Sequence, residues 1–151
     1  MSTDTEKIAS LIYSYAERID AGDLPVVADL FADATYRSQA GTEYRGAAAV
    51  LEILRRMVIL YDGSPRTKHV TTNLVIDVDD ANSLAQARSY YTVFQATEAL
   101  PMQSIIAGRY HDRFERRGVD WHFADRLIFI DLVGDLTHHL RVGLPRTDGD
   151  R

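Results

Sequence analysis

The chain has 151 residues, 46% hydrophobic and 26% charged, a composition typical of one globular domain with a single core. Its formal net charge of −5 argues against nucleic-acid binding, which needs a basic face. It contains no cysteine, which excludes disulfides, thiolate nucleophiles and cysteine-ligated metals.

The N-terminal residues lack a basic region followed by a long apolar run, so we expect no signal peptide. The apolar runs elsewhere are too short to cross a bilayer. The expectation is therefore a cytoplasmic protein that binds neither membranes nor nucleic acids.

Three helices are predicted in the first part of the chain. Thr3 and Glu6 have the spacing of a capping box, which opens a helix that ends before Gly22. A short second helix is predicted over 24–31, and a third over about 46–61.

Strands are predicted between and after these helices. Two short strands, 35–38 and 43–45, flank a turn at Gly41. After residue 65 the hydrophobic period changes from helical to alternating, which indicates long strands joined by short turns. These strands are 68–78, 84–97, 103–116 and 121–132. Such a series forms an antiparallel meander.

This order of elements predicts an α+β fold, with three N-terminal helices packed on a strongly curved, mainly antiparallel sheet. Long strands twist, and helices on the concave side would make the sheet a cone-shaped α+β barrel with an internal cavity. Cavities of this kind bind small molecules. We expect a single domain over 1–140 and a loose polar tail over 141–151.

Two polar side chains are candidates for lining that cavity. Asp20 falls at the edge of the apolar face of the first helix, where a carboxylate is costly unless paired; alternatively it only ends the helix. His69 opens the first long strand, and alternation places it on one face with Thr71 and Asn73. That face meets either the cavity or solvent, and from the residues alone a structural role is favoured for both side chains.

Other residues have open interpretations. Arg126 lies in an apolar stretch and either pairs with Asp125 or an adjacent strand, or contacts a ligand. The remaining four histidines are available in principle, but none shows a metal spacing with carboxylates, so no metal is predicted. The residues expected to line the pocket are aromatic or apolar, and they are Phe31, Tyr91, Phe94, Tyr110 and Ile106.

Several short motifs, in order, resemble the SnoaL-like branch of the nuclear transport factor 2-like superfamily. They are YSYAERIDAGD at 13–23, LFADA at 30–34, TKHVTTN at 67–73, RYHDRF at 109–114 and WHF at 121–123. The resemblance extends to scytalone dehydratase, bile acid 7α-dehydratase and lindane dehydrochlorinase. These enzymes share an aspartate at the end of the first helix and a histidine opening the first long strand, the positions of Asp20 and His69.

The resemblance implies roles for three further residues. Tyr36 matches a pocket tyrosine of scytalone dehydratase, and Tyr15 matches the active-site tyrosine of the bile acid enzyme. Arg126 matches an active-site arginine of the dehydrochlorinase. A second histidine of scytalone dehydratase would fall near Phe94 or Gln95, so that function is either missing or moved here. Tyr15 and Asp20 are about 140° apart on an ideal helix, so both reach one pocket only if the helix end unwinds or the pocket wraps around it.

The resemblance implies a cofactor-independent lyase or isomerase, of the dehydratase or polyketide cyclase kind, acting on a small hydrophobic, cyclic molecule. His69 would be the general base, Asp20 would orient it, and a tyrosine or Arg126 would stabilise enolate charge. One alternative is a non-catalytic small-ligand-binding or structural subunit, such as the β subunit of ring-hydroxylating dioxygenases. Another is epoxide hydrolysis, whose Asp–Arg–Asp arrangement the spacing does not suggest. We expect a homo-oligomer, either a dimer or a trimer.

Overall fold

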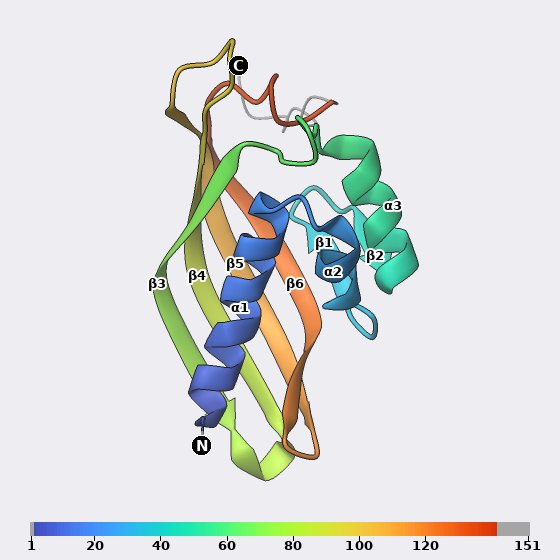
Figure 1. Cartoon of the computed structure of the whole chain (residues 1–151). Coiled ribbons are helices and arrows are strands. Elements are labelled where there is room, and N and C mark those ends of the chain that lie inside the picture. The colour runs from blue at the N-terminus through green and yellow to red at the C-terminus, as the bar shows by residue number, and fades with distance from the viewer. Residues whose placement is uncertain (1, 142–151) are drawn as a thin grey trace.

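The computed structural model describes residues 2–141 (Figure 1). The helices are α1 (Asp4–Asp20), α2 (Leu24–Asp29), α3 (Ala47–Met57) and the short 3-10 helix η1 (Asp80–Asn82). The strands are β1 (Thr35–Ser38), β2 (Glu43–Arg45), β3 (Thr67–Asp79), β4 (Leu84–Gln95), β5 (Gln103–Arg117) and β6 (Asp120–Val133).

The strands form one six-stranded sheet in the order β2-β1-β6-β5-β4-β3. The four long strands make the predicted antiparallel meander, and among the strands of residues 2–141 only the β1–β6 pairing is parallel. Figure 1 shows α1 crossing one face of the curved sheet, with α2 and α3 beside β1 and β2. The predicted α+β class is confirmed. The sheet stays open because β2 and β3 lie at its two edges, so a closed barrel does not form.

Helix α1 begins where the sequence predicts. The Thr3 hydroxyl accepts from the Glu6 backbone N–H, and the Glu6 carboxylate accepts from the Thr3 backbone N–H. This capping box satisfies two N–H groups that have no partner within the helix. One face of the helix then packs on the sheet, through Ile8, Ile12, Tyr15 and Ile19.

Three predicted element ends are too late. Helix α2 ends at Asp29 rather than at residue 31, and β4 ends at Gln95 rather than at 97. Helix α3 ends at Met57 rather than near Tyr61. The cause at α3 is tertiary, because the next residue adopts extended backbone and pairs with Leu140.

The predicted alternation along β3 holds as far as Thr72 and is wrong from Asn73 onward. Asn73 has a positive φ of 54°, and the pairing register with β4 shifts between Thr72 and Val75. This β-bulge exposes Asn73 and turns Leu74 toward the core. His69 and Thr71 still share the inner face, whereas Asn73 does not join them.

The predicted tail lies outside the described residues, apart from Arg141, whose backbone N–H donates to the carbonyl of Met57. Within residues 2–141, no helix is long and apolar enough to cross a membrane.

Candidate functional site

Asp20 and His69 form a close polar pair at one end of the inner face. The ring Nδ1 of His69 lies 2.6 Å from Oδ1 of Asp20, and the side chains are only 8% and 10% exposed. The backbone N–H of His69 donates to Oδ2 at 2.8 Å, and the Thr67 hydroxyl donates to Oδ1 at 2.8 Å. The carboxylate at the end of α1 is therefore fixed against the start of β3.

The hydrogen bonds determine which protonation state this pair favours. Burial alone would raise the pKa of Asp20, but the bonds from His69 and Thr67 outweigh burial and lower it. Asp20 is therefore a carboxylate, which can only accept hydrogen bonds. The proton of the short contact consequently sits on Nδ1 of His69, and Nε2 becomes the nitrogen that can accept a proton.

A cluster of tyrosines occupies the middle of the inner face. The hydroxyls of Tyr15 (α1) and Tyr36 (β1) share a 2.7 Å hydrogen bond. Tyr110 meets Tyr15 edge to face at a centroid distance of 5.9 Å, and Tyr91 stacks on Tyr110 at 4.4 Å. Phe31 contacts both Tyr15 and Tyr36 edge to face. Five aromatic residues selected from the sequence therefore meet in one cluster: Tyr15, Tyr36, Phe31, Tyr91 and Tyr110.

Burial decides what these hydroxyls can do. It raises the pKa of Tyr15 and Tyr91, and it raises the pKa of Tyr36 and Tyr110 well above the ordinary phenol value. The phenols therefore stay neutral and cannot serve as bases near neutral pH. Since two hydroxyls bonded to each other use only one of their two protons, the Tyr15–Tyr36 pair retains one O–H to donate.

Arg126 lies beneath these rings and is fully buried. Its Nε and Nη2 donate to the two carboxylate oxygens of Asp112 at 2.8 and 2.9 Å. Its guanidinium carbon is 3.8 Å from the ring centre of Tyr110 and 4.2 Å from that of Tyr15. Burial opposes its charge, but Asp112 outweighs burial and raises the pKa of Arg126. Of the open interpretations, pairing with an adjacent strand is the one observed.

The third nitrogen of Arg126 differs from the other two. Nη1 is buried and has no hydrogen-bond partner within residues 2–141. Asp125, which the sequence offered as the other partner, instead accepts two bonds from Arg37 on the opposite face of the sheet.

The Asp20–His69 pair and the tyrosine cluster adjoin each other. His69 is paired with Val93 across β3 and β4, and Thr71 is paired with Tyr91. These pairs are two residues apart, which is about 7 Å along a strand. The angle between Tyr15 and Asp20 fits this arrangement, because Tyr15 contacts β1, β5 and β6 whereas Asp20 contacts β3. The polar groups therefore lie on both sides of α1.

Two other predicted lining residues lie differently. Ile106 is partly buried and packs against the core. Phe94 alternates with the buried Val93 and Gln95, and it is paired with the exposed Lys68. Because side chains alternate along a strand, Phe94 lies on the outer face and is not beside Tyr91.

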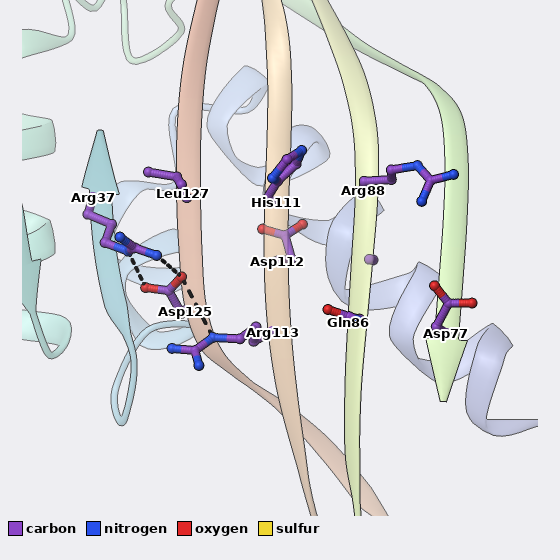
Figure 2. A pocket seen from close by; sticks show the side chains of 10 residues that line it. Arg37, Asp77, Gln86, Arg88, His111, Asp112, Arg113, Asp125 and Leu127 are labelled. Carbon is purple, nitrogen blue, oxygen red and sulfur yellow. Dashed lines mark hydrogen bonds and ion pairs between the residues drawn. The ribbon is translucent and has the colours of Figure 1, made fainter. Parts of the chain in front are cut away.

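The two hollows described within residues 2–141 both lie on the outer face, away from the pair. Figure 2 shows the larger, of about 340 Å³, where Arg37, Arg113 and His111 project from the sheet on the side away from the helices. The enclosed cavity expected from the sequence is not among them.

His139 was not selected as a site residue from its sequence pattern, but the structure places it next to the pair. Its ring centre is 6.4 Å from that of His69, and the residue is 7% exposed. It follows the last strand, after which the chain crosses the end of the sheet toward α3 (Figure 1), and its carbonyl accepts from the Ile59 N–H. This path depends on contacts between distant segments, so no local sequence pattern predicts it. Within residues 2–141, no group of three or more His, Asp or Glu side chains gathers as metal ligands would.

The structure is an α+β domain in which a carboxylate at the end of α1 holds a nearly buried imidazole at the start of β3. A model of the SnoaL-like domain matches residues 1–126, so the chain belongs to this family. Among curated proteins, none matches the chain significantly.

Solved structures share the fold at low sequence identity. One is an NTF2-like protein with a cystatin-like fold from Novosphingobium aromaticivorans, with a TM-score of 0.70, 20% identity, and coverage of 84% of this chain and 81% of that one. Another from this organism, named "Putative Scytalone Dehydratase", has a TM-score of 0.72, 19% identity, and coverage of 98% and 95%. A third is the beta subunit of a "putative aromatic-ring-hydroxylating dioxygenase" from the same organism. Its TM-score is 0.67 at 19% identity, and the match covers 84% of this chain and 88% of that one. At these identities the likeness shows the fold alone.

Proposed function

We propose that the protein is a cofactor-independent lyase or isomerase that acts on a small hydrophobic, cyclic molecule by general acid–base chemistry. The observation that carries the proposal is the 2.6 Å contact between Nδ1 of His69 and Asp20, on the face of the sheet covered by α1. A base oriented in this way presents Nε2 to a substrate proton.

The reaction that suits this pair is the loss of water from a β-hydroxyketone. Nε2 of His69 takes a proton from the carbon beside the carbonyl, and the electron pair forms an enolate. Asp20 stabilises the resulting imidazolium through Nδ1. The C–O bond to the β-hydroxyl then breaks as a carbon–carbon double bond forms. The imidazolium gives its proton to the departing oxygen, which leaves as water, and His69 is neutral again. An isomerase would return the proton to a different carbon.

The enolate oxygen needs donors that remain protonated. The Tyr15–Tyr36 hydroxyl pair has one O–H to donate, and burial keeps both phenols neutral. Nη1 of Arg126 is a further donor and carries positive charge. Aromatic rings surround these donors, which favours a flat or cyclic apolar substrate over a charged one. The fold shared with the structure named as a dehydratase is consistent with this chemistry.

The test uses 3-hydroxycyclohexanone and 3-hydroxy-1-tetralone in D₂O, followed by proton NMR. A lyase removes the β-hydroxyl as water, and an isomerase exchanges the proton beside the carbonyl for deuterium. We expect Asp20→Asn and His69→Gln each to slow the reaction about 10²-fold or more while the circular dichroism spectrum stays native.

The matched control is His122→Gln, which changes an exposed histidine on β6 and should leave the rate unchanged. An active His69→Gln protein would contradict the mechanism, and so would a wild-type protein that neither dehydrates nor exchanges either ketone.

A second candidate is a non-catalytic subunit, and the outer face of the sheet favours it. Val70, Thr92, Ala107 and Leu132 are successive cross-strand partners in one row across β3 to β6. Val70 is 40% exposed and Leu132 is 70% exposed, which is typical of a surface that meets another chain. The same face is where we expect the homo-oligomer to form. Purification with a larger, iron-containing chain from the native organism would favour the subunit; a dimer or trimer of this chain alone would favour the enzyme.

A further inference from the structure

His139 is held in place by contacts to its backbone rather than to its ring. Its carbonyl accepts from the N–H of Ile59, and its own N–H donates to Leu136. The preceding carbonyl, of His138, accepts from the Tyr61 hydroxyl at 2.6 Å and from the Gln95 amide at 3.0 Å. These backbone bonds fix the residue beside His69, and none of them involves the imidazole ring.

The ring of His139 carries a buried polar atom with no protein partner. Nδ1 has no hydrogen-bond partner within residues 2–141, although the residue is only 7% exposed. A polar atom buried without a partner costs stability, so its retention in a core position needs a reason. The ring is edge-on to His69, with an angle of 69° between the two ring planes.

Gln95 supplies a second buried atom of the same kind nearby. Its Nε2 donates both to the Pro65 carbonyl and to the His138 carbonyl, which fixes the orientation of the amide. Its Oε1 is then left without a partner within the described residues. Gln95 is the cross-strand partner of Thr67, whose hydroxyl binds Asp20. Two unpaired polar atoms thus lie in the immediate surroundings of the Asp20–His69 pair.

We propose that His139 is a second histidine of the site, and that its Nδ1 hydrogen-bonds an oxygen of the substrate. The proposal rests on the proposed function, since His69 remains the base. In a β-hydroxyketone both oxygens lie two bonds from the carbon that loses its proton. Rings 6.4 Å apart can therefore reach the C–H and one oxygen of the same small molecule, each at ordinary contact distance.

The charge of His139 suits this role. Burial, assisted by the neighbouring His69, lowers the pKa of His139 to about 4. At neutral pH the ring is therefore uncharged and binds a substrate oxygen without repelling the imidazolium that forms on His69. A charged second ring at this distance would oppose that step.

The experiment compares three variants of the full chain with the wild type. Asn places an amide atom near the position of Nδ1, so His139→Asn should keep most of the rate. His139→Leu removes the polar atom and should lower the turnover of the ketones at least about tenfold, the loss expected for one hydrogen bond. His138→Asn is the matched control on the adjacent, less buried histidine and should behave as wild type.

Nitrogen-15 NMR of the histidine rings separates this proposal from the proposed function. Addition of 3-hydroxy-1-tetralone to the wild type should shift the ring signals of His139 even if no turnover occurs. A His139→Leu protein as active as wild type overturns the proposal. The proposal also fails if neither 3-hydroxycyclohexanone nor 3-hydroxy-1-tetralone shifts the ring signals of His139. Shifted His139 signals without turnover would instead leave the binding role standing and remove the proposed reaction.

Discussion

Arg126 and Asp112 face each other across β5 and β6 and form a bidentate ion pair in which both side chains are 0% exposed. The pair lies under the rings of Tyr15 and Tyr110, which contact the guanidinium from the helix side. This buried ion pair therefore supports the tyrosine cluster from the sheet side.

Asp112→Asn should strongly destabilise the protein. The substitution keeps the shape of the side chain but leaves the Arg126 cation buried without a countercharge, and breaking such a pair costs about 3–5 kcal/mol. Urea unfolding monitored by tryptophan fluorescence gives the free energy of unfolding for the variant and the wild type.

The matched control for that variant is Asp131→Asn. It breaks the Arg109–Asp131 pair, which has the same bidentate geometry but is solvent-exposed, so stability should change little. Equal small effects from both variants would mean that the Arg126–Asp112 pair is hydrated in solution.

The Tyr15–Tyr36 hydrogen bond predicts a non-additive pair of substitutions. Tyr15→Phe or Tyr36→Phe alone leaves one buried hydroxyl without its partner, which costs about 1–3 kcal/mol. The double variant should cost less than the sum of the two, because no unpaired hydroxyl remains. The free energy of unfolding in urea, measured for the wild type, the two single variants and the double variant, completes this double-mutant cycle. Tyr13→Phe, on the exposed side of the same helix, should have no effect; strict additivity would argue against the hydroxyl contact.

The hydrophobic pattern was sufficient for the meander and for the inner face of α1, but it could not reveal the bulge in β3. The pattern assigns every second residue to one face, whereas one extra residue at Asn73 reverses the assignment for the rest of the strand. Asparagine is a residue type that tolerates positive φ, yet one such residue in a strand is too weak a signal to shift a register.

The backbone at Asn73 gives a direct test of the bulge. Asn73→Val places a β-branched residue at φ 54° and should cost about 1–3 kcal/mol. Thr72→Val changes the neighbouring exposed residue, which has ordinary strand backbone, and should stay within about 0.5 kcal/mol of wild type. If the two variants unfold at the same urea concentration, β3 is regular in solution and the predicted alternation holds.

The candidate site also contains residues that the sequence could identify and residues that it could not. Asp20 and His69 were found because the family resemblance fixes their places in the chain, and the structure brings them together. The partner of Arg126 was left open because the strand register that places Asp112 opposite it depends on a shift in the β5–β6 pairing, where β6 has one extra residue between Phe123 and Asp125. His139 was missed because its place depends on a backbone return after the last strand.

The lowered pKa of His139 predicts a loss of stability in mild acid. In the unfolded chain a histidine has a pKa of about 6.5, whereas burial lowers the pKa of His139 to about 4 in the folded protein. Between these values the unfolded chain binds a proton that the folded protein does not, so acid favours unfolding. The contribution of His139 to stability is therefore complete above about pH 6.5. It is lost as the pH falls, by about 3 kcal/mol at pH 4.

The measurement is the free energy of unfolding in urea at pH 7, 5.5 and 4.5 for the wild type and His139→Leu. The wild type should lose more stability than the variant over this interval, because the variant has no proton to gain at this position. The pKa of Asp20 is also lowered in the folded protein, but its effect appears only below its ordinary value near 4 and is common to both proteins. Parallel pH profiles for the two proteins would mean that the His139 ring is open to solvent, which would also remove the basis for its contact with a substrate oxygen.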